Sequence, residues 1–205
     1  MVSLKIVYNF ETFISNKMPK VETFNRDEIL GKVVSLFHEK GYNATSMQDL
    51  VDVTGLNRSS IYNSFGSKKE LYRESLSTYK QKANKYVQKV LVHTSEPLET
   101  IRKIFDTTPE DQVNGCFIGN CTTEMANQDQ EIKGFLQNNL HSMQELFEEL
   151  VAMGQTQGSI NKNKSAKEYA AFLFTALQGL RVTGILLNEK SEFESIVNTT
   201  LSILK

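Results

Sequence analysis

The segment 58–65 carries hydrogen-bonding side chains on one face and apolar side chains on the other. Ile61 and Phe65 lie four positions apart, so on a helix they share one face, which we expect to pack inward onto other apolar residues. The opposite face then presents Arg58, Ser59, Tyr62 and Asn63. A major groove admits one helix, and guanidinium, hydroxyl and amide groups on it can reach base edges. The pattern therefore predicts recognition by hydrogen bonding rather than bond-breaking chemistry.

Arg58 is the candidate for reading a base, because its planar fork matches O6 and N7 of guanine. Ser59, Ser60 and Asn63 are the other candidates at base edges. The residues better suited to phosphate are Thr45, Ser46, Tyr62, Lys68 and Lys69, and Met47 completes the predicted DNA-contacting set. Each phosphate candidate has a structural alternative. Thr45 and Ser46 can be helix caps, Tyr62 can pack against the next long helix, and the two lysines can form a solvated helix start.

The remaining reactive side chains form no catalytic or metal-binding pattern. His38, His93 and His141 lie in three separate segments, and the spacing of Cys116 and Cys121 is not that of a zinc site. We interpret the two cysteines as buried thiols, with a redox switch as the alternative. The sequence contains no nucleophile elbow, phosphate-binding loop or dinucleotide fingerprint. We therefore expect no enzyme activity, no metal and no cofactor.

The elements that position segment 58–65 are predicted to be helices. The chain has 205 residues, a formal net charge of −1 and only three prolines, which favours long helices over a sandwich or barrel. Capping residues at Ser46, Asn57 and Ser67 predict two short helices followed by a long one, after a first helix that stops at Gly41. Two short helices joined by a tight turn follow the helix-turn-helix plan.

The second half of the chain is also helical by its hydrophobic period. We expect a short helix after Pro97 and longer helices over 132–153, 165–188 and 193–204. No segment approaches about 20 uninterrupted apolar residues, so we expect no membrane span. The fold class is therefore all-α.

Taken together, residues 24–72 resemble the DNA-binding domain of the tetracycline-repressor (TetR) family of bacterial regulators. The matching pieces, in the family's order and without a gap, are Arg26, Ile29-Leu30, Leu36-Phe37, Gly41-Tyr42, Thr45-Ser46-Met47, Gly55-Leu56, Ser60-Ile61-Tyr62, Phe65 and Ser67–Leu71. Residues 115–126, GCFIGNCTTEMA, are more weakly similar to the regulatory half of one branch. Ser59 and Ser64 depart from the glycine and the ring-bearing residue common in the family, which leaves the operator sequence open.

The resemblance implies an N-terminal extension over 1–22, a DNA-binding domain over 23–83 and a ligand-binding and dimerisation domain over 84–205. It also implies a homodimer that binds double-stranded operator DNA, with a small-molecule effector whose binding residues we leave unassigned. In residues 1–17 only Lys5 is basic and Glu11 interrupts the apolar stretch, which is unlike a signal peptide, so we expect a cytoplasmic protein. Repression is the family's common mode. The alternatives are activation, ligand-independent DNA binding, or an enzyme carried on a DNA-targeting module.

Two further expectations concern particular residues. Residues 1–17 should be dispensable, because no family-like element begins before Met18, which is an alternative start of translation. By analogy with the family, the helices over 165–188 and 191–204 are expected to pack against their copies in a dimer interface that includes Leu180 and Leu201. The alternative is that the apolar stripes of these two helices only fill the core of one chain.

Overall fold

The structure is a computed structural model that describes residues 24–106 and 115–205. Within these residues it contains nine α-helices and one short 3-10 helix and no strand, which confirms the predicted all-α class. The expectations for 1–22 and for the dispensable segment 1–17 fall outside the described residues.

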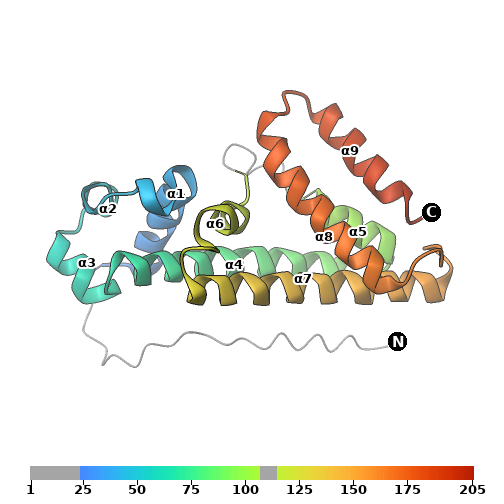
Figure 1. Cartoon of the computed structure of the whole chain (residues 1–205), viewed down its shortest axis with the longest axis horizontal. Coiled ribbons are helices and arrows are strands. Elements are labelled where there is room, and N and C mark those ends of the chain that lie inside the picture. The colour runs from blue at the N-terminus through green and yellow to red at the C-terminus, as the bar shows by residue number, and fades with distance from the viewer. Residues whose placement is uncertain (1–23, 107–114) are drawn as a thin grey trace.

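Three helices form a compact unit at one end of the molecule (Figure 1): α1 (Arg26–Ala44), α2 (Met47–Thr54) and α3 (Arg58–Phe65). The first helix begins because the Asn25 side chain accepts hydrogen bonds from the backbone N–H groups of the next turn. It buries Ile29, Leu30, Val33, Val34 and Phe37, whose spacing in the sequence forms one apolar stripe on a helix. Helical geometry breaks at Gly41, with φ 79° and ψ 172°, and one further turn runs to Ala44.

The rest of the chain extends away from this unit. Its elements are α4 (Lys68–His93), α5 (Pro97–Phe105), α6 (Phe117–Met125), α7 (Gln130–Gln157), α8 (Ala166–Thr183), η1 (Gly184–Leu186) and α9 (Lys190–Ser202). Figure 1 shows α4 leading from the N-terminal unit toward α5, and α6 lying between α1 and the C-terminal helices.

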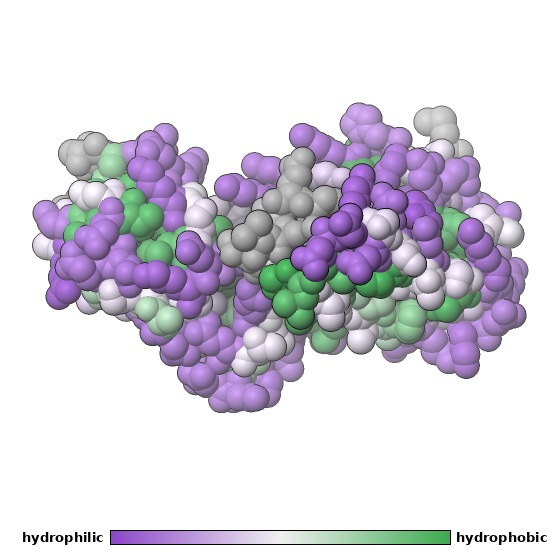
Figure 2. Space-filling view, turned by 90° about the horizontal axis from the view of Figure 1, so that it is seen from above, coloured by the Kyte–Doolittle hydropathy of each residue, from purple (hydrophilic) through white to green (hydrophobic). Residues whose placement is uncertain are grey.

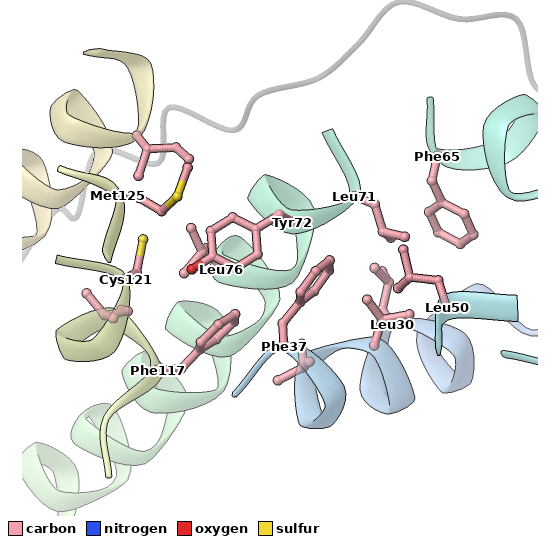
Figure 3. Packing of buried hydrophobic residues seen from close by; sticks show 14 of the residues in the cluster. Leu30, Phe37, Leu50, Phe65, Leu71, Tyr72, Leu76, Phe117, Cys121 and Met125 are labelled. Carbon is pink, nitrogen blue, oxygen red and sulfur yellow. The ribbon is translucent and has the colours of Figure 1, made fainter. Parts of the chain in front are cut away.

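A first hydrophobic core, here called the head cluster, joins α1–α3 to the start of α4, to α6 and to the start of α7. Tyr72 of α4 packs between Phe37 of α1 and Phe117 of α6, with ring centroids 4.9 and 5.5 Å away (Figure 3). The head cluster therefore crosses the predicted division between 23–83 and 84–205. Helix α6 follows that division in the sequence but shares its core with the helices before it.

A second core, the body cluster, joins α5, the second half of α7, α8 and α9. Leu180 and Leu201 belong to it and are almost fully buried within one chain. Their assignment to a dimer interface was wrong, because their side chains already pack inside the monomer. The helical period of α4 predicts one apolar face made of Tyr72, Leu76, Tyr79, Ala83, Tyr86, Val87 and Val90. That prediction is wrong in part, since Ala83 and Tyr86 are exposed.

The segment Ala166–Leu186 is, within the described residues, long and apolar enough to cross a membrane by length and composition alone. Its residues Leu173, Leu177 and Leu180 are buried in the body cluster. A core helix of a folded bundle passes the same test of length and hydropathy, so this segment is no evidence of a membrane span.

Candidate nucleic-acid interface

The turn between α2 and α3 is built by short-range hydrogen bonds. Gly55 ends α2 in the left-handed conformation, and its N–H donates to the carbonyl of Val51. The Thr54 hydroxyl donates to Leu50 O at 2.6 Å and accepts from Leu56 N–H at 3.2 Å. Asn57 then caps α3 by accepting from Ser60 N–H at 2.8 Å. All of these contacts are local, and they shape the turn that joins the two helices.

One face of α3 is anchored and the other is free. Ile61 and Phe65 are buried in the head cluster together with Phe37 and Leu50, as predicted. Leu36 is partly buried against the same cluster. The opposite face, here called the recognition face, consists of the exposed side chains of Arg58, Ser59, Tyr62 and Asn63.

The recognition face offers a cation, hydroxyls and an amide to solvent. Tyr62 is 49% exposed, so its side chain is not buried and is open to solvent on this face. The Asn63 side-chain amide donates to the Ser59 hydroxyl at 3.3 Å. Arg58 is the only charged residue in α3, and its guanidinium has no partner among the residues that the structure describes. Ser60 is half-buried beside this face.

The residues expected at the start of α2 are placed differently from one another. Ser46 is exposed and forms a capping box with Asp49. Thr45 is buried, and its hydroxyl donates to Gly41 O at 2.6 Å, so its side chain holds the chain before α2 together and faces away from solvent. Met47 is partly buried against the head cluster. Of the three, only the Ser46 side chain is exposed to solvent.

The two lysines at the start of α4 have protein partners. The Lys68 ammonium lies 4.4 Å from the centroid of the Tyr42 ring, and burial lowers the pKa of this lysine. Lys69 forms an ion pair with Asp129 of α7, which raises the pKa of Lys69 and lowers that of Asp129. The structure therefore directs Lys69 toward α7 instead of bringing it to the recognition face.

An ion pair between Arg26 of α1 and Glu74 of α4 also stabilises the position of α3. Arg26 donates two hydrogen bonds to the Glu74 carboxylate, at 2.9 and 2.7 Å, and lies 4.3 Å from the Phe65 ring centroid. Arg26 also donates to the carbonyl of Ser64 at 3.2 Å. One guanidinium thereby joins the start of α1, the end of α3 and α4, which fixes α3 at its C-terminal end.

Sequence reasoning missed Glu124 of α6. Its carboxylate accepts hydrogen bonds from the backbone N–H groups of Tyr42 at 2.9 Å and Asn43 at 2.7 Å. The contact spans more than 80 positions and involves backbone donors, so no spacing of side chains could have revealed it. The only signal was that Glu124 lies in GCFIGNCTTEMA, the segment noted for its resemblance to a regulatory half.

A second exposed surface lies on the C-terminal helices. Hydrophobic residues form a green band across this part of the molecule (Figure 2). Here the exposed large hydrophobic residues, together called the apolar face, are Phe172, Val182, Ile185, Leu186, Ile196 and Ile203. They come from α8, η1, α9 and the residue that follows α9. Leu186 is 79% exposed.

The other reactive side chains do not converge. Cys116 and Cys121 are free and buried, and burial raises the pKa of the Cys121 thiol to about 11. In the described parts of the chain, no three His, Cys, Asp or Glu residues are grouped so as to hold a metal ion.

Two family models match the chain. The model of bacterial regulatory proteins of the tetR family matches residues 29–74, and the model of the tetracyclin repressor-like C-terminal domain matches residues 97–200. The first covers most of the helix-turn-helix unit, and the second runs from α5 into α9.

Individual proteins match over most of their length. The HTH-type transcriptional repressor ComR of Escherichia coli strain K12 is 31% identical in a match 199 residues long that covers 92% of this chain and 92% of its own. The negative regulator IcaR of the biofilm operon icaADBC, from Staphylococcus aureus strain Newman, is 21% identical over 87% of this chain and 97% of its own. A cysteine mutant of the TetR family regulator CifR, solved with 26-bp operator DNA, shares the fold with a TM-score of 0.80. It is 22% identical over 91% of this chain and 100% of that chain.

Proposed function

The chain belongs to the TetR family of bacterial regulatory proteins and is a DNA-binding transcriptional regulator, and we propose that it is a homodimeric repressor released from its operator by a small-molecule effector. The observation that carries the proposal is the pairing of two unlike exposed surfaces in one chain. The recognition face suits a base-lined groove, and the apolar face suits a second copy of the protein.

We propose a division into a DNA-binding domain over 23–83 and a regulatory and dimerising domain over 84–205. The recognition face supports the first assignment, with Arg58 on a base edge and Ser59, Ser60 and Asn63 beside it. Ser46, Tyr62 and Lys68 are proposed as phosphate contacts, which set register without reading sequence. Lys69 has a weaker claim, because Asp129 holds its ammonium.

Dimerisation is proposed through the apolar face. Six large apolar side chains are exposed on these helices, and a gathering of exposed apolar side chains on a folded chain favours association, because leaving them in water is unfavourable. Two copies of one face form a closed two-fold interface. A two-fold dimer presents two recognition helices, so the operator is proposed to be palindromic, with half-sites about 10 bp or a multiple apart.

The effector is proposed to bind among the helices of the regulatory domain. One feature supports a polar group on it: the side-chain oxygen of Gln178 on α8 is buried, without a hydrogen-bond partner in the described chain. The effector must prefer the conformation that does not bind DNA, and DNA must weaken effector binding by the same factor. Cytoplasmic location and the lack of enzyme activity belong to the same proposal, supported by relatives named as transcriptional repressors.

Footprinting on the DNA upstream of the protein's own gene tests the proposal, combined with light scattering of the free protein. We expect a dimer in solution and protection of two related half-sites on one face of the duplex. A monomer that protects no preferred sequence would contradict it.

A further inference from the structure

The corner between α6 and α7 contacts both sides of the helix-turn-helix. Its three carboxylates, Glu124, Asp129 and Glu131, are here called the acidic corner. Each carboxylate is paired with a group of α1 or α4.

Glu124 is held by backbone donors rather than by a side chain. Two successive N–H groups, of Tyr42 and Asn43, converge on its two carboxylate oxygens. Successive backbone N–H groups that point into one concavity form an anion site, and hydrogen bonds to a charged acceptor are stronger than neutral ones. The carboxylate thus fixes the backbone that leads from α1 into α2.

The backbone at Gly41 lies very close to the Glu124 carboxylate. Its φ of 79° is a left-handed value, and a Cβ built there would lie 3.0 Å from Glu124 Oε2. Glycine is therefore needed for the conformation and for the approach of the carboxylate. The break that ends the regular part of α1 coincides with the point where α6 touches it.

The other two carboxylates hold the start of α4. Asp129 pairs with Lys69, and Glu131 pairs with Arg73, whose Nη2 lies 2.6 Å from its Oε1. The recognition helix α3 lies between α2 and α4 in the chain and has only eight residues of its own. The orientation of α3 therefore depends on the two elements that the acidic corner holds.

The apolar contacts beneath the corner are continuous with the head cluster. Phe117, Cys121 and Met125 of α6 face Tyr72 and Leu76 of α4 (Figure 3). If α6 moved without α1 and α4, a cavity would open in this core. Because opening a cavity in a close-packed interior loses van der Waals contacts, the three helices are expected to move together.

We propose that Glu124 is a positioning residue, which sets the pose of the helix-turn-helix by holding the amides of Tyr42 and Asn43. This inference rests on the DNA-binding function and deepens it, since it names the contact through which the regulatory helices govern the recognition face. Glu124 itself touches no DNA. Its loss leaves the fold intact and lets the α1–α2 connection move.

The test compares Glu124→Ala and Glu124→Gln with Glu149→Gln, an exposed glutamate of α7 with no partner in the described chain. Hydrogen exchange of the Tyr42 and Asn43 amides, thermal midpoint and operator affinity are measured on each full-length protein. For Glu124→Ala we expect amide exchange about tenfold faster and operator binding about tenfold weaker, as for a lost hydrogen bond to a charged group. Glu124→Gln keeps one acceptor oxygen and should fall between, and Glu149→Gln should match the wild type.

Two results would overturn the inference. Unchanged exchange at Tyr42 and Asn43 would show that Glu124 does not hold them. A lower thermal midpoint with unchanged operator affinity would make Glu124 an ordinary stabilising contact. Failure of the wild-type protein to prefer any DNA would instead contradict the proposed function, while the exchange measurement, which needs no DNA, would still report on the contact.

Discussion

The recognition face of α3 and the apolar face of α8 and α9 are both exposed, yet they differ in almost every chemical respect. On α3 the exposed side chains donate and accept hydrogen bonds, and the apolar ones are buried. On α8 both sides of the helix are apolar, because Leu173 and Leu177 are buried while Phe172 and Val182 face out. The contrast explains why Ala166–Leu186 is apolar enough to resemble a membrane span, whereas α3 is plainly amphipathic.

The difference teaches what each surface can bind. A hydrated polyanion is met by groups that replace water's hydrogen bonds, so α3 loses little by staying exposed until DNA arrives. An exposed apolar face has no such partner in water and is stabilised by association with another apolar surface. One surface is suited to reversible recognition and the other to permanent assembly.

Placing charges on the apolar face should give the largest effect, which is a loss of dimer stability. The double variant Phe172→Glu with Ile196→Glu places a charge on each of the two helices. We expect about 3–5 kcal/mol of lost dimer stability for a buried unpaired carboxylate, which is a factor of at least about 100 in the dimer dissociation constant. Light scattering should find a folded monomer, and operator binding should fall accordingly.

Two controls separate assembly from folding. Leu177→Glu lies on the same helix in the body cluster and should unfold the protein, as should Leu201→Glu. Ala152→Glu lies on an exposed part of α7 and should leave the dimer unchanged. A dimer that survives the Phe172 and Ile196 changes would remove the apolar face from the interface.

Breaking the recognition face should cost less and should act on sequence preference. Arg58→Ala removes the only charge of α3, with an expected cost of about 1–3 kcal/mol per half-site and loss of preference at one base pair. Thermal stability should not change, because the side chain is exposed and unpaired within the described chain. Binding titrations against operator and scrambled duplexes measure this. An equal loss on both duplexes would make Arg58 a phosphate contact and pass base reading to Ser59, Ser60 or Asn63.

Lys68 and Lys69 test how far the DNA-contacting surface extends beyond the recognition face. Lys68→Ala should weaken binding to all sequences and reduce the slope of log affinity against log salt by about one per half-site. Lys69→Ala should leave that slope unchanged, because its ammonium already pairs with Asp129. Titrations at several salt concentrations separate the two. A reduced slope for Lys69→Ala would show that DNA displaces Asp129.

The helix-turn-helix could be predicted from sequence because its signals are local. The caps at Ser46, Asn57 and Ser67 each act within three residues, and all three form in the structure. The spacing of Ile61 and Phe65 fixed which face of α3 is exposed. These are contacts that a reader of the sequence can locate without knowing the fold.

The features that escaped prediction depend on distant segments. Glu124 contacts Tyr42 across 82 positions, and Lys69 pairs with Asp129, which is also far away in the sequence. Leu180 and Phe172 are both apolar residues of α8, and only the position of α7 and α9 decides which one is buried. Apolar periodicity identifies a helix, but it cannot divide two apolar sides between a core and an interface.

The smallest effect on stability is expected at Asp49, which caps the start of α2. The Lys40 ammonium, 2.7 Å from its carboxylate, together with the N–H and hydroxyl of Ser46, holds the pKa of Asp49 well below its ordinary value of 3.8. A lowered pKa means that the folded state favours the ionised carboxylate. Its stabilisation is therefore complete above pH 3.8 and is lost as the pH falls through the lower, folded-state value.

Asp49→Asn should reduce the thermal midpoint slightly at neutral pH and progressively less as the pH falls below 3.8. High salt should shrink the effect at neutral pH, because the pair is exposed. Lys40→Met should lose only the part that the ion pair contributes, and the double variant should lose no more than Asp49→Asn alone. A difference that persisted unchanged into acid would mean that the Asp49 charge does not stabilise the start of α2, leaving the Ser46 hydroxyl as the sole cap.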